Sequence, residues 1–160
     1  QYGAFAYPED RPDSAKTVGE TLYDLMAENK WEGAKRWAAQ ADRIAPTLVG
    51  GSKKHGGPDL GPTRARNAWA ELGIDGRGIA NTAPTPGFDG MPRLTSRMMA
   101  RIQGFPDTWT FGSRKTVACR MIGNAFPPPV AKAVGEQIKE CLAHGCADSE
   151  SKISLSRAVV

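Results

Sequence analysis

The chain has 160 residues, of which 18 are glycine and 12 are proline, and it carries a net charge of +4. Its length suffices for one domain with a modest core, and the glycine and proline content predicts many loops. The sequence has no apolar run near the roughly 18 residues that span a bilayer, no secretory signal, and no cysteine spacing typical of disulfides or zinc. These exclusions predict a cytoplasmic protein without a structural metal.

Two short helices are predicted near the amino terminus. Thr17 and Glu20 have the spacing of a capping box, in which each side chain binds the other residue's backbone N–H. Apolar residues then recur with helical period over about 17–29, namely Val18, Leu22, Leu25 and Met26. Residues 31–40 form a second helical candidate, with Trp31, Ala34 and Ala38 on one side. We interpret both helices as packing elements, and residues 5–8 before them as the end of a strand.

The helical pattern stops at Ile44. Residues 44–61 begin with a short strand-like run and then become rich in glycine and cations. Glycine lets the backbone adopt positive φ and approach another surface closely, so this composition suits the grooves and phosphates of DNA. The same composition is also typical of a flexible surface loop without a ligand. Composition alone leaves both interpretations open.

A third helix is predicted over 62–73. Pro62 is typical of a helix start and Gly73 of a carboxyl-terminal cap. Its buried stripe is predicted to be Ala65, Trp69 and Leu72. Arg64 and Arg66 stand in the first turn, where the helix dipole favours acidic groups. A bound polyanion would remove that conflict, which hints at phosphate contact; surface arginines without a function are the alternative.

Residues 93–120 concentrate positive charge, with six basic side chains against one acidic one, Asp107. Within this run Thr95 or Ser96 can cap a helix that Gly104 stops. Its inward side chains are predicted to be Met98, Met99 and Ile102. Aromatic residues that follow are predicted to pack in the core: Phe105, Trp109 and Phe111. The basic run by itself is equally typical of a solvated helix face.

The last predicted helix follows a turn. Gly123 and Asn124 permit a tight turn, and the prolines at 127–129 stiffen the chain and begin a helix. Its apolar stripe reaches Gly145 and consists of Val130, Val134, Ile138 and Cys141 or Leu142. Such an apolar face needs a partner to cover it. Residues 147–160 are polar, and we expect them to form a disordered tail.

Two motifs in this second half resemble those of the DNA cytosine-5 methyltransferase family. The first consists of Arg93-Leu94-Thr95, Arg97, Ala100-Arg101 and Gly104-Phe105-Pro106-Asp107, and it is similar to the ninth of the family's ten ordered motifs. The second, Ile122-Gly123-Asn124-Ala125-Phe126-Pro127-Pro128, is similar to the tenth. They follow the family's order, and an amphipathic segment comes after them. The resemblance covers about residues 1–143.

The resemblance also identifies motifs that this sequence does not contain. Members of the family have a glycine-rich cofactor loop, a Pro-Cys-Gln segment with the nucleophile, a Glu-Asn-Val segment and a Gln-x-Arg-x-Arg segment. None of these occurs here, and none of the three cysteines follows a proline. The chain therefore resembles a carboxyl-terminal part of such an enzyme, without a catalytic residue of its own.

The resemblance implies a DNA-reading role for the middle of the chain. The family's recognition region usually has Thr-Leu or Thr-Ile before its reading loop, and Thr47-Leu48 matches that dipeptide. The next loop would enter the major groove, where cationic and small polar side chains contact base edges. The implied DNA-binding residues are Thr47, Ser52, Lys53, Lys54, His55, Arg64 and Arg66, with Arg97 supporting the backbone of the recognition loops.

The tenth motif implies a cofactor contact. By resemblance, Gly123, Asn124 and Ala125 line the edge of an S-adenosylmethionine pocket whose main part lies outside this chain. Side-chain and backbone hydrogen bonds from Asn124 and Ala125 would hold the amino-acid end of the cofactor. The ninth motif departs from the family at Met98, where glutamate is usual.

The expected fold is mixed α/β with much irregular structure. It would consist of a small target-recognition domain and the last helix of a Rossmann-like methyltransferase domain that is absent from this chain. The expected parts are an exit from that domain at 1–43, the recognition domain at 44–112, the tenth-motif turn and helix at 113–146, and the tail at 147–160.

The implied reaction is methyl transfer from S-adenosylmethionine to carbon 5 of a cytosine flipped out of double-stranded DNA, within a restriction–modification system. A catalytic domain or subunit, in cis or in trans, would complete the enzyme, and the chain alone would be inactive. The alternative is a non-catalytic DNA-binding remnant or specificity subunit. The tenth motif favours the enzyme, because a pure DNA-binding module has no use for a cofactor-edge turn.

Overall fold

The structure, a computed structural model, describes residues 5–9, 15–48, 58–112 and 114–157, with side chains as far as residue 143. The chain divides into two compact units. The larger one is Pro12–Pro127, and the other combines Gln1–Arg11 with Pro128–Val160. The larger unit contains the predicted DNA-binding residues and the predicted cofactor-edge residues at 123–125.

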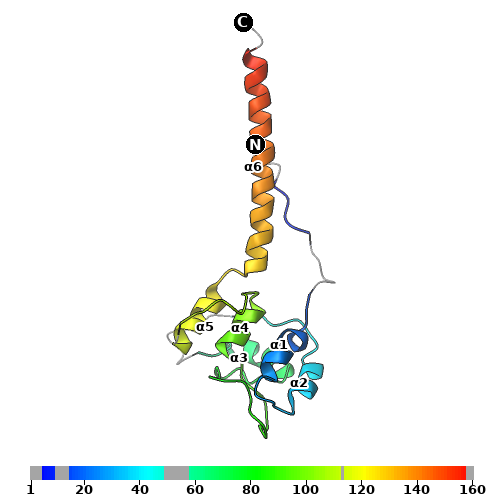
Figure 1. The fold of residues 1–160 in the computed structure, drawn as a ribbon, viewed down its shortest axis with the longest axis vertical. Coiled ribbons are helices and arrows are strands. Elements are labelled where there is room, and N and C mark those ends of the chain that lie inside the picture. Colours follow the sequence, from blue (N-terminus) through cyan, green and yellow to red (C-terminus); the bar gives the residue numbers. More distant parts are fainter. Residues whose placement is uncertain (1–4, 10–14, 49–57, 113, 158–160) are drawn as a thin grey trace. The chain divides into compact units, whose positions relative to one another are not determined.

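Among the described residues of the larger unit, five helices are joined by long loops (Figure 1). They are α1 (Val18–Met26), α2 (Ala34–Gln40), α3 (Thr63–Glu71), α4 (Ser96–Ile102) and α5 (Lys115–Asn124). The described residues contain no β-strand, and an isolated bridge between Ala80 and Thr95 is the nearest approach to one. The expected α/β fold is therefore wrong for this part of the chain, which is helical and irregular.

The two segments with strand-like patterns explain this error. Residues 44–48 and 5–8 have apolar side chains, but neither pairs with another segment in a sheet among the described residues. Leu48 is buried against the packed helices instead, with 5% of its surface exposed. A short apolar run can be buried against helices or can form a strand of a sheet, so its pattern does not decide between the two.

The predicted starts of α1, α3 and α4 are confirmed, as are the glycine stops of α3 and α4, whereas α1 ends at Met26 and not near residue 29. Thr17 and Glu20 form the reciprocal capping box of α1. Pro62 precedes α3, and Gly73 adopts the left-handed φ of +68° just beyond its end. Thr95 caps α4, and Gly104 follows it at a φ of +84°. Since only glycine adopts this conformation without strain, both glycines stop their helices as expected.

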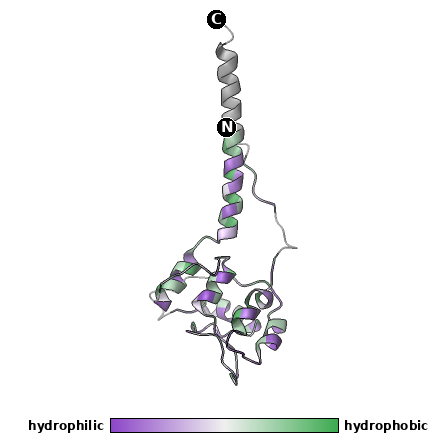
Figure 2. Cartoon of the chain, in the orientation of Figure 1, coloured by the Kyte–Doolittle hydropathy of each residue, from purple (hydrophilic) through white to green (hydrophobic). Residues whose placement is uncertain are grey.

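One hydrophobic core joins all five helices. It includes the predicted stripe of α1, Trp69 of α3 and Leu72 just after that helix. Met98 and Met99 of α4 and Cys119 and Ile122 of α5 also belong to it. Hydrophobic and hydrophilic residues alternate along each helix (Figure 2), as expected for amphipathic helices around a shared core. Phe105 and Phe111 pack against this core as predicted, whereas Trp109 is 59% exposed, so its predicted burial is wrong.

The close packing of α1 on α2 depends on Gly19. A Cβ atom at this position would collide with the backbone carbonyl of Ala38 in α2. The backbone N–H groups of Val18 and Gly19, at the start of α1, donate to the carbonyls of Arg43 and Ala41 at 2.9 Å each. The chain that leaves α2 therefore satisfies donors of α1 that have no partner within that helix.

Helix α5 was not predicted from the sequence. A tight turn was expected at Gly123 and Asn124, but these residues form the last turn of a helix that begins at Lys115. Ala118, Cys119 and Ile122 are buried at helical spacing, while Val117 and Met121 face outward. Basic residues at 114, 115 and 120 interrupt the apolar helical period, and Gly123 is typical of a turn, so the sequence pattern does not indicate this helix.

The second unit contains α6, Pro128–Arg157. It begins at the proline run as predicted, but it continues past Gly145, because the residues that follow include neither proline nor glycine to break it. The disorder expected for 147–160 stays a prediction. Val130, Ile138 and Leu142 of the predicted stripe are 46–65% exposed. Across the part of the chain that the structure describes, no helix is long and apolar enough to cross a membrane.

Candidate functional site

The ninth motif folds around Arg101, on the last turn of α4. Its Nε atom donates to Asp107 at 3.0 Å, and its Nη2 atom pairs with the other oxygen of the same carboxylate. Its Nη1 atom contacts Asp24 of α1 and donates to the carbonyl of Thr21 at 3.2 Å. Arg101 therefore ties α1, α4 and the Pro-Asp turn after α4 together, and its side chain is only 20% exposed.

These contacts shift the acidity of both carboxylates. The hydrogen bond from Arg101 lowers the pKa of Asp107 below its ordinary value. Burial raises the pKa of Asp24, but the hydrogen bond and the charge of Arg101 outweigh it, so this pKa is also lowered. Both groups therefore stay charged at neutral pH.

Arg97, one turn before Arg101, occupies the outer side of the same network. It lies 3.4 Å from Glu28 and 3.6 Å from Asp107, with 51% of its side chain exposed. Its predicted role in supporting DNA-reading loops is compatible with this position and stays a prediction. The resemblance implies this role for Arg97. In the fold, Arg101 is the more buried of the two arginines and has more partners.

Met98, the departure from the family's motif, takes over part of a capping box. Its backbone N–H donates to the Thr95 hydroxyl at 3.2 Å, and its sulfur lies 3.4 Å from the backbone nitrogen of Thr95. The sulfur therefore occupies the place of the usual carboxylate as a weaker acceptor. The side chain is buried, with 1% exposed. The substitution changes the cap of α4 and leaves the Arg101 network intact.

The predicted cofactor-edge residues lie at the end of α5. Asn124 is exposed, and its side chain makes no hydrogen bond within the described residues. Ala125 is engaged within the unit, because its N–H donates to the carbonyl of Ile122 at 3.2 Å. The amide side chain of Gln103 donates to the carbonyls of Ile122 and Ala125 at 3.0 and 3.3 Å. Sequence reasoning missed Gln103, which lies at the end of α4.

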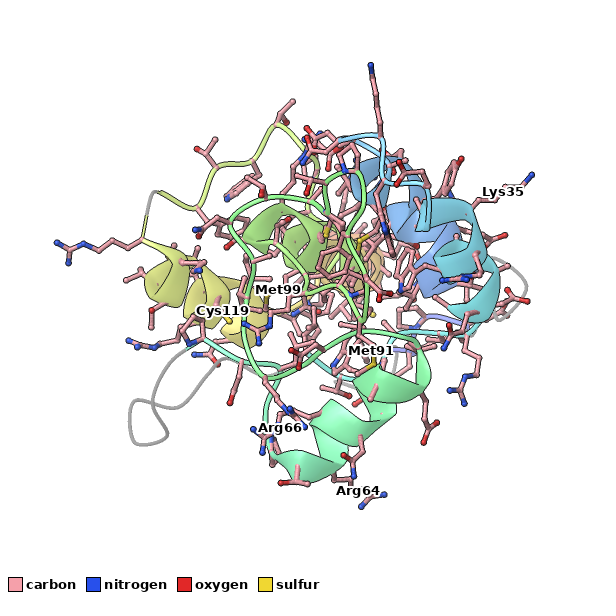
Figure 3. All side chains as sticks on the ribbon, turned by 90° about the horizontal axis from the view of Figure 1, so that it is seen from below. Lys35, Arg64, Arg66, Met91, Met99 and Cys119 are labelled. Carbon is pink, nitrogen blue, oxygen red and sulfur yellow. The ribbon has the colours of Figure 1, made fainter. Side chains whose placement is uncertain are left out.

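Arg64 and Arg66 lie on α3, at the outer side of the unit (Figure 3). Arg66 donates to the hydroxyl of Thr63 at 3.2 Å, and the first turn of α3 contains no acidic residue. Neither arginine has an ion-pair partner among the described residues. The predicted conflict with the helix dipole is therefore present in the fold, and their charges remain available to an anion.

The predicted recognition dipeptide, Thr47-Leu48, is divided between surface and core. Leu48 is buried, while Thr47 is exposed and lines a pocket of about 340 Å³. Gln103 and Pro127 line the same pocket, so the start of the predicted recognition loop lies beside both motifs. Ser52, Lys53, Lys54 and His55 lie outside the described residues, and their predicted DNA contacts stay predictions.

The other chemical candidates are structural. Cys119 is fully buried in the core, and its sulfur lies 3.9 Å from the carbonyl of Asp59. Lys115 donates to the carbonyl of Ile79 at 2.9 Å. No group of three or more His, Cys, Asp or Glu residues suited to a metal ion occurs in the described ranges.

Comparison with known proteins gives the family. The model for C-5 cytosine-specific DNA methylases matches residues 2–140. The chain belongs to this family. Type II methyltransferase M.NaeI of Lentzea aerocolonigenes is 61% identical over 141 residues, which are 86% of this chain and 34% of the relative. Type II methyltransferase M.NgoMIV of Neisseria gonorrhoeae is 50% identical over 141 residues, 86% of this chain and 44% of the relative.

A shorter match extends to animals. DNA (cytosine-5)-methyltransferase 1 of Mus musculus is 47% identical over 58 residues, 36% of this chain and 4% of the relative. No solved structure matches the chain significantly. The chain spans about a third of the length of M.NaeI and less than half that of M.NgoMIV. The family that the two motifs predicted is confirmed.

Proposed function

We propose that this chain is the DNA-recognition and cofactor-edge part of a type II DNA (cytosine-5)-methyltransferase in a restriction–modification system. The match over 141 residues to M.NaeI and M.NgoMIV supports the enzyme class. In this proposal residues 44–112 recognise DNA, and 113–146 return to a catalytic domain of Rossmann-like fold. That domain, in cis or in trans, supplies the remaining motifs.

The proposed DNA surface combines α3 with the loop that follows Thr47. Arg64 and Arg66 have no acidic partners in the described structure, so phosphates would compensate their charges. Lys53, Lys54 and His55 would contact base edges in the major groove. This division assigns orientation on the duplex to α3 and choice of sequence to the loop.

The proposed cofactor contact is the side chain of Asn124. S-adenosylmethionine supplies the methyl group that is transferred to carbon 5 of a flipped cytosine. An exposed carboxamide offers both a donor and an acceptor, which suits the ammonium and carboxylate of the cofactor's amino-acid end. Gly123 gives the backbone beside Asn124 no side chain that would obstruct this approach. The backbone N–H of Ala125 is already used, so the side chain of Asn124 carries this contact.

The proposed enzyme needs a nucleophile from another part. A cysteine thiolate must add to carbon 6 of the flipped base before carbon 5 can accept a methyl group. Cys119 is fully buried among core side chains, where no base can reach it. We therefore expect the purified chain to transfer no methyl group by itself.

An exchange enzyme tests this proposal. In M.NaeI, the 141 aligned residues are replaced by those of this chain, and methyl transfer from labelled S-adenosylmethionine to plasmid DNA is measured. Bisulfite sequencing then locates the modified cytosines. We expect the exchange enzyme to methylate cytosines within one short sequence, and the chain alone to methylate none.

Two results would contradict the proposal. Methylation by the chain alone would refute the need for a second part. An exchange enzyme that folds and binds DNA without methylating it would instead identify the chain as a non-catalytic DNA-binding module.

A further inference from the structure

Gln103 connects the ninth motif to the tenth. It ends α4, directly after the turn that contains Arg101, and its side-chain amide reaches the end of α5. Its Nε2 atom lies 3.0 Å from the carbonyl oxygen of Ile122 and 3.3 Å from that of Ala125. These two acceptors flank Gly123 and Asn124.

The contact has a clear physical reason. The last four carbonyl groups of a helix have no partner within the helix, so a side-chain donor at this end is favourable. The amide of Gln103 has two N–H groups, and both of its acceptors belong to the last turn of α5 or to its cap. Because the acceptors lie before and after Asn124 in sequence, they fix the backbone of that residue at the end of the helix.

The position of α5 does not depend on Gln103 alone. Ala118, Cys119 and Ile122 anchor the helix in the core, with 0–2% of their surfaces exposed. Removal of the amide should therefore leave α5 folded and loosen its last turn. The contact contributes more to the orientation of the turn than to folding.

We propose that Gln103 is a positioning residue for cofactor binding, which holds the carboxyl end of α5 at Gly123–Ala125 so that Asn124 meets the amino-acid end of S-adenosylmethionine. This inference rests on the function proposed above for Asn124. Gln103 also lines the pocket beside Thr47, and Arg101 on the same helix holds α1. Helix α4 thus links the start of the predicted recognition loop to the cofactor edge.

The test uses Gln103→Met in the exchange enzyme, with Gln103→Ala as a second variant. Methionine keeps the length and packing of glutamine but has no N–H donors. We expect the Kd for S-adenosylmethionine, measured by calorimetry, to rise about 10-fold through loss of both hydrogen bonds. The Kd for DNA should change less than about twofold, because the amide of Gln103 is already bound to two carbonyls and phosphate contacts from cationic side chains dominate that affinity.

Gln40→Met is the matched control. Gln40 also ends a helix, α2, and is exposed, with no hydrogen bond from its side chain in the described structure. Its substitution should change neither Kd, and the melting temperatures of all three variants should stay close to that of the parent. A fall in melting temperature with an unchanged Kd for S-adenosylmethionine would show a purely structural role and overturn the inference. Equal losses for cofactor and DNA would overturn it too.

A double-mutant cycle separates this inference from the proposal on which it rests. If Gln103 acts through Asn124, Gln103→Met should weaken cofactor binding less than about twofold once Asn124→Ala is present. If Asn124→Ala has no effect on cofactor binding, the proposed cofactor edge fails and the inference fails with it. If Asn124→Ala weakens binding but Gln103→Met does not, only the positioning role is wrong. Full additivity of the two changes would also refute that role.

Discussion

Two groups of arginines in the larger unit have opposite electrostatic surroundings. Arg97 and Arg101 on α4 lie among Asp24, Glu28 and Asp107, so the surrounding carboxylates neutralise them. The arginines of α3 have no acidic partner in the described structure. The α4 group holds the fold together, and the α3 group leaves positive charge exposed at a helix start.

This comparison shows why charge along the sequence differs from charge on the surface. Residues 93–120 are the most basic stretch of the chain, yet carboxylates from elsewhere in the fold cancel part of that charge. Asp75 pairs with Arg93 at 2.9 Å, for example. The two arginines of α3 give a weaker signal in sequence, but no carboxylate in the described structure pairs with them, which is why we propose them as the phosphate contacts.

The largest expected effect is on stability. Arg101→Ala removes three hydrogen-bond partners at once, leaves Asp24 without its counter-charge, and leaves Asp107 with Arg97 alone at 3.6 Å. Because these carboxylates are partly exposed, water screens them, and the expected loss is about 2 kcal/mol in the free energy of unfolding. Urea denaturation of the exchange enzyme, or of the chain if it folds alone, measures it. Arg64→Ala should change stability by less than about 0.5 kcal/mol, and similar losses for both variants would contradict the comparison.

The second prediction adds the proposed reading loop to the comparison. Lys53→Ala and Lys54→Ala should each lower the preference for the cognate site over random DNA by about 10-fold, because a base contact discriminates between sequences. Binding of the exchange enzyme to cognate and scrambled duplexes measures this preference. If either substitution changed only the salt dependence of binding, the loop would contact phosphates and the major-groove assignment would be wrong.

The third prediction concerns the α3 arginines. Arg64→Ala and Arg66→Ala should each weaken binding to every duplex by a similar factor, and reduce the slope of log K against log salt by about one. Titrations at several salt concentrations give both quantities. Arg43→Ala is the matched control, because Arg43 already pairs with Glu71 at 3.0 Å. An unchanged slope for both α3 variants would place this helix outside the DNA surface.

Sequence reasoning found those elements whose signals are local. The capping box of α1, the proline and glycine that bound α3, and the cap of α4 each involve residues within one or two turns. Asn124 and Arg97 were found only through the family's motifs. The motifs imply roles for these two residues, which stay predictions, and do not indicate the partners that surround them.

The missed features depend on contacts distant in sequence. Arg101 binds the carbonyl of Thr21, 80 residues away, and Gln103 reaches Ile122 and Ala125 across a loop. No local pattern specifies such pairs. Trp109 was expected in the core because aromatic residues around a Pro-Asp turn usually pack, but in the fold it lies at the surface, after the turn that Arg101 holds.

The smallest expected effect is the pH dependence of the α4 network. The pKa values of Asp24 and Asp107 are lowered in the fold, so the unfolded chain binds their protons more tightly. Their contribution to stability is therefore complete above the unfolded pKa of about 4 and is lost as the pH falls through the lowered values. Arg101→Ala removes the interactions that lower both pKa values most. The stability difference between parent and variant should then be smaller at about pH 3 than at pH 7, by about 0.5 kcal/mol after discount for solvent screening. Arg64 pairs with no carboxylate in the described structure, so Arg64→Ala should change the free energy of unfolding by the same amount at both pH values. A constant difference for Arg101→Ala would mean that its contacts stabilise the fold by packing alone.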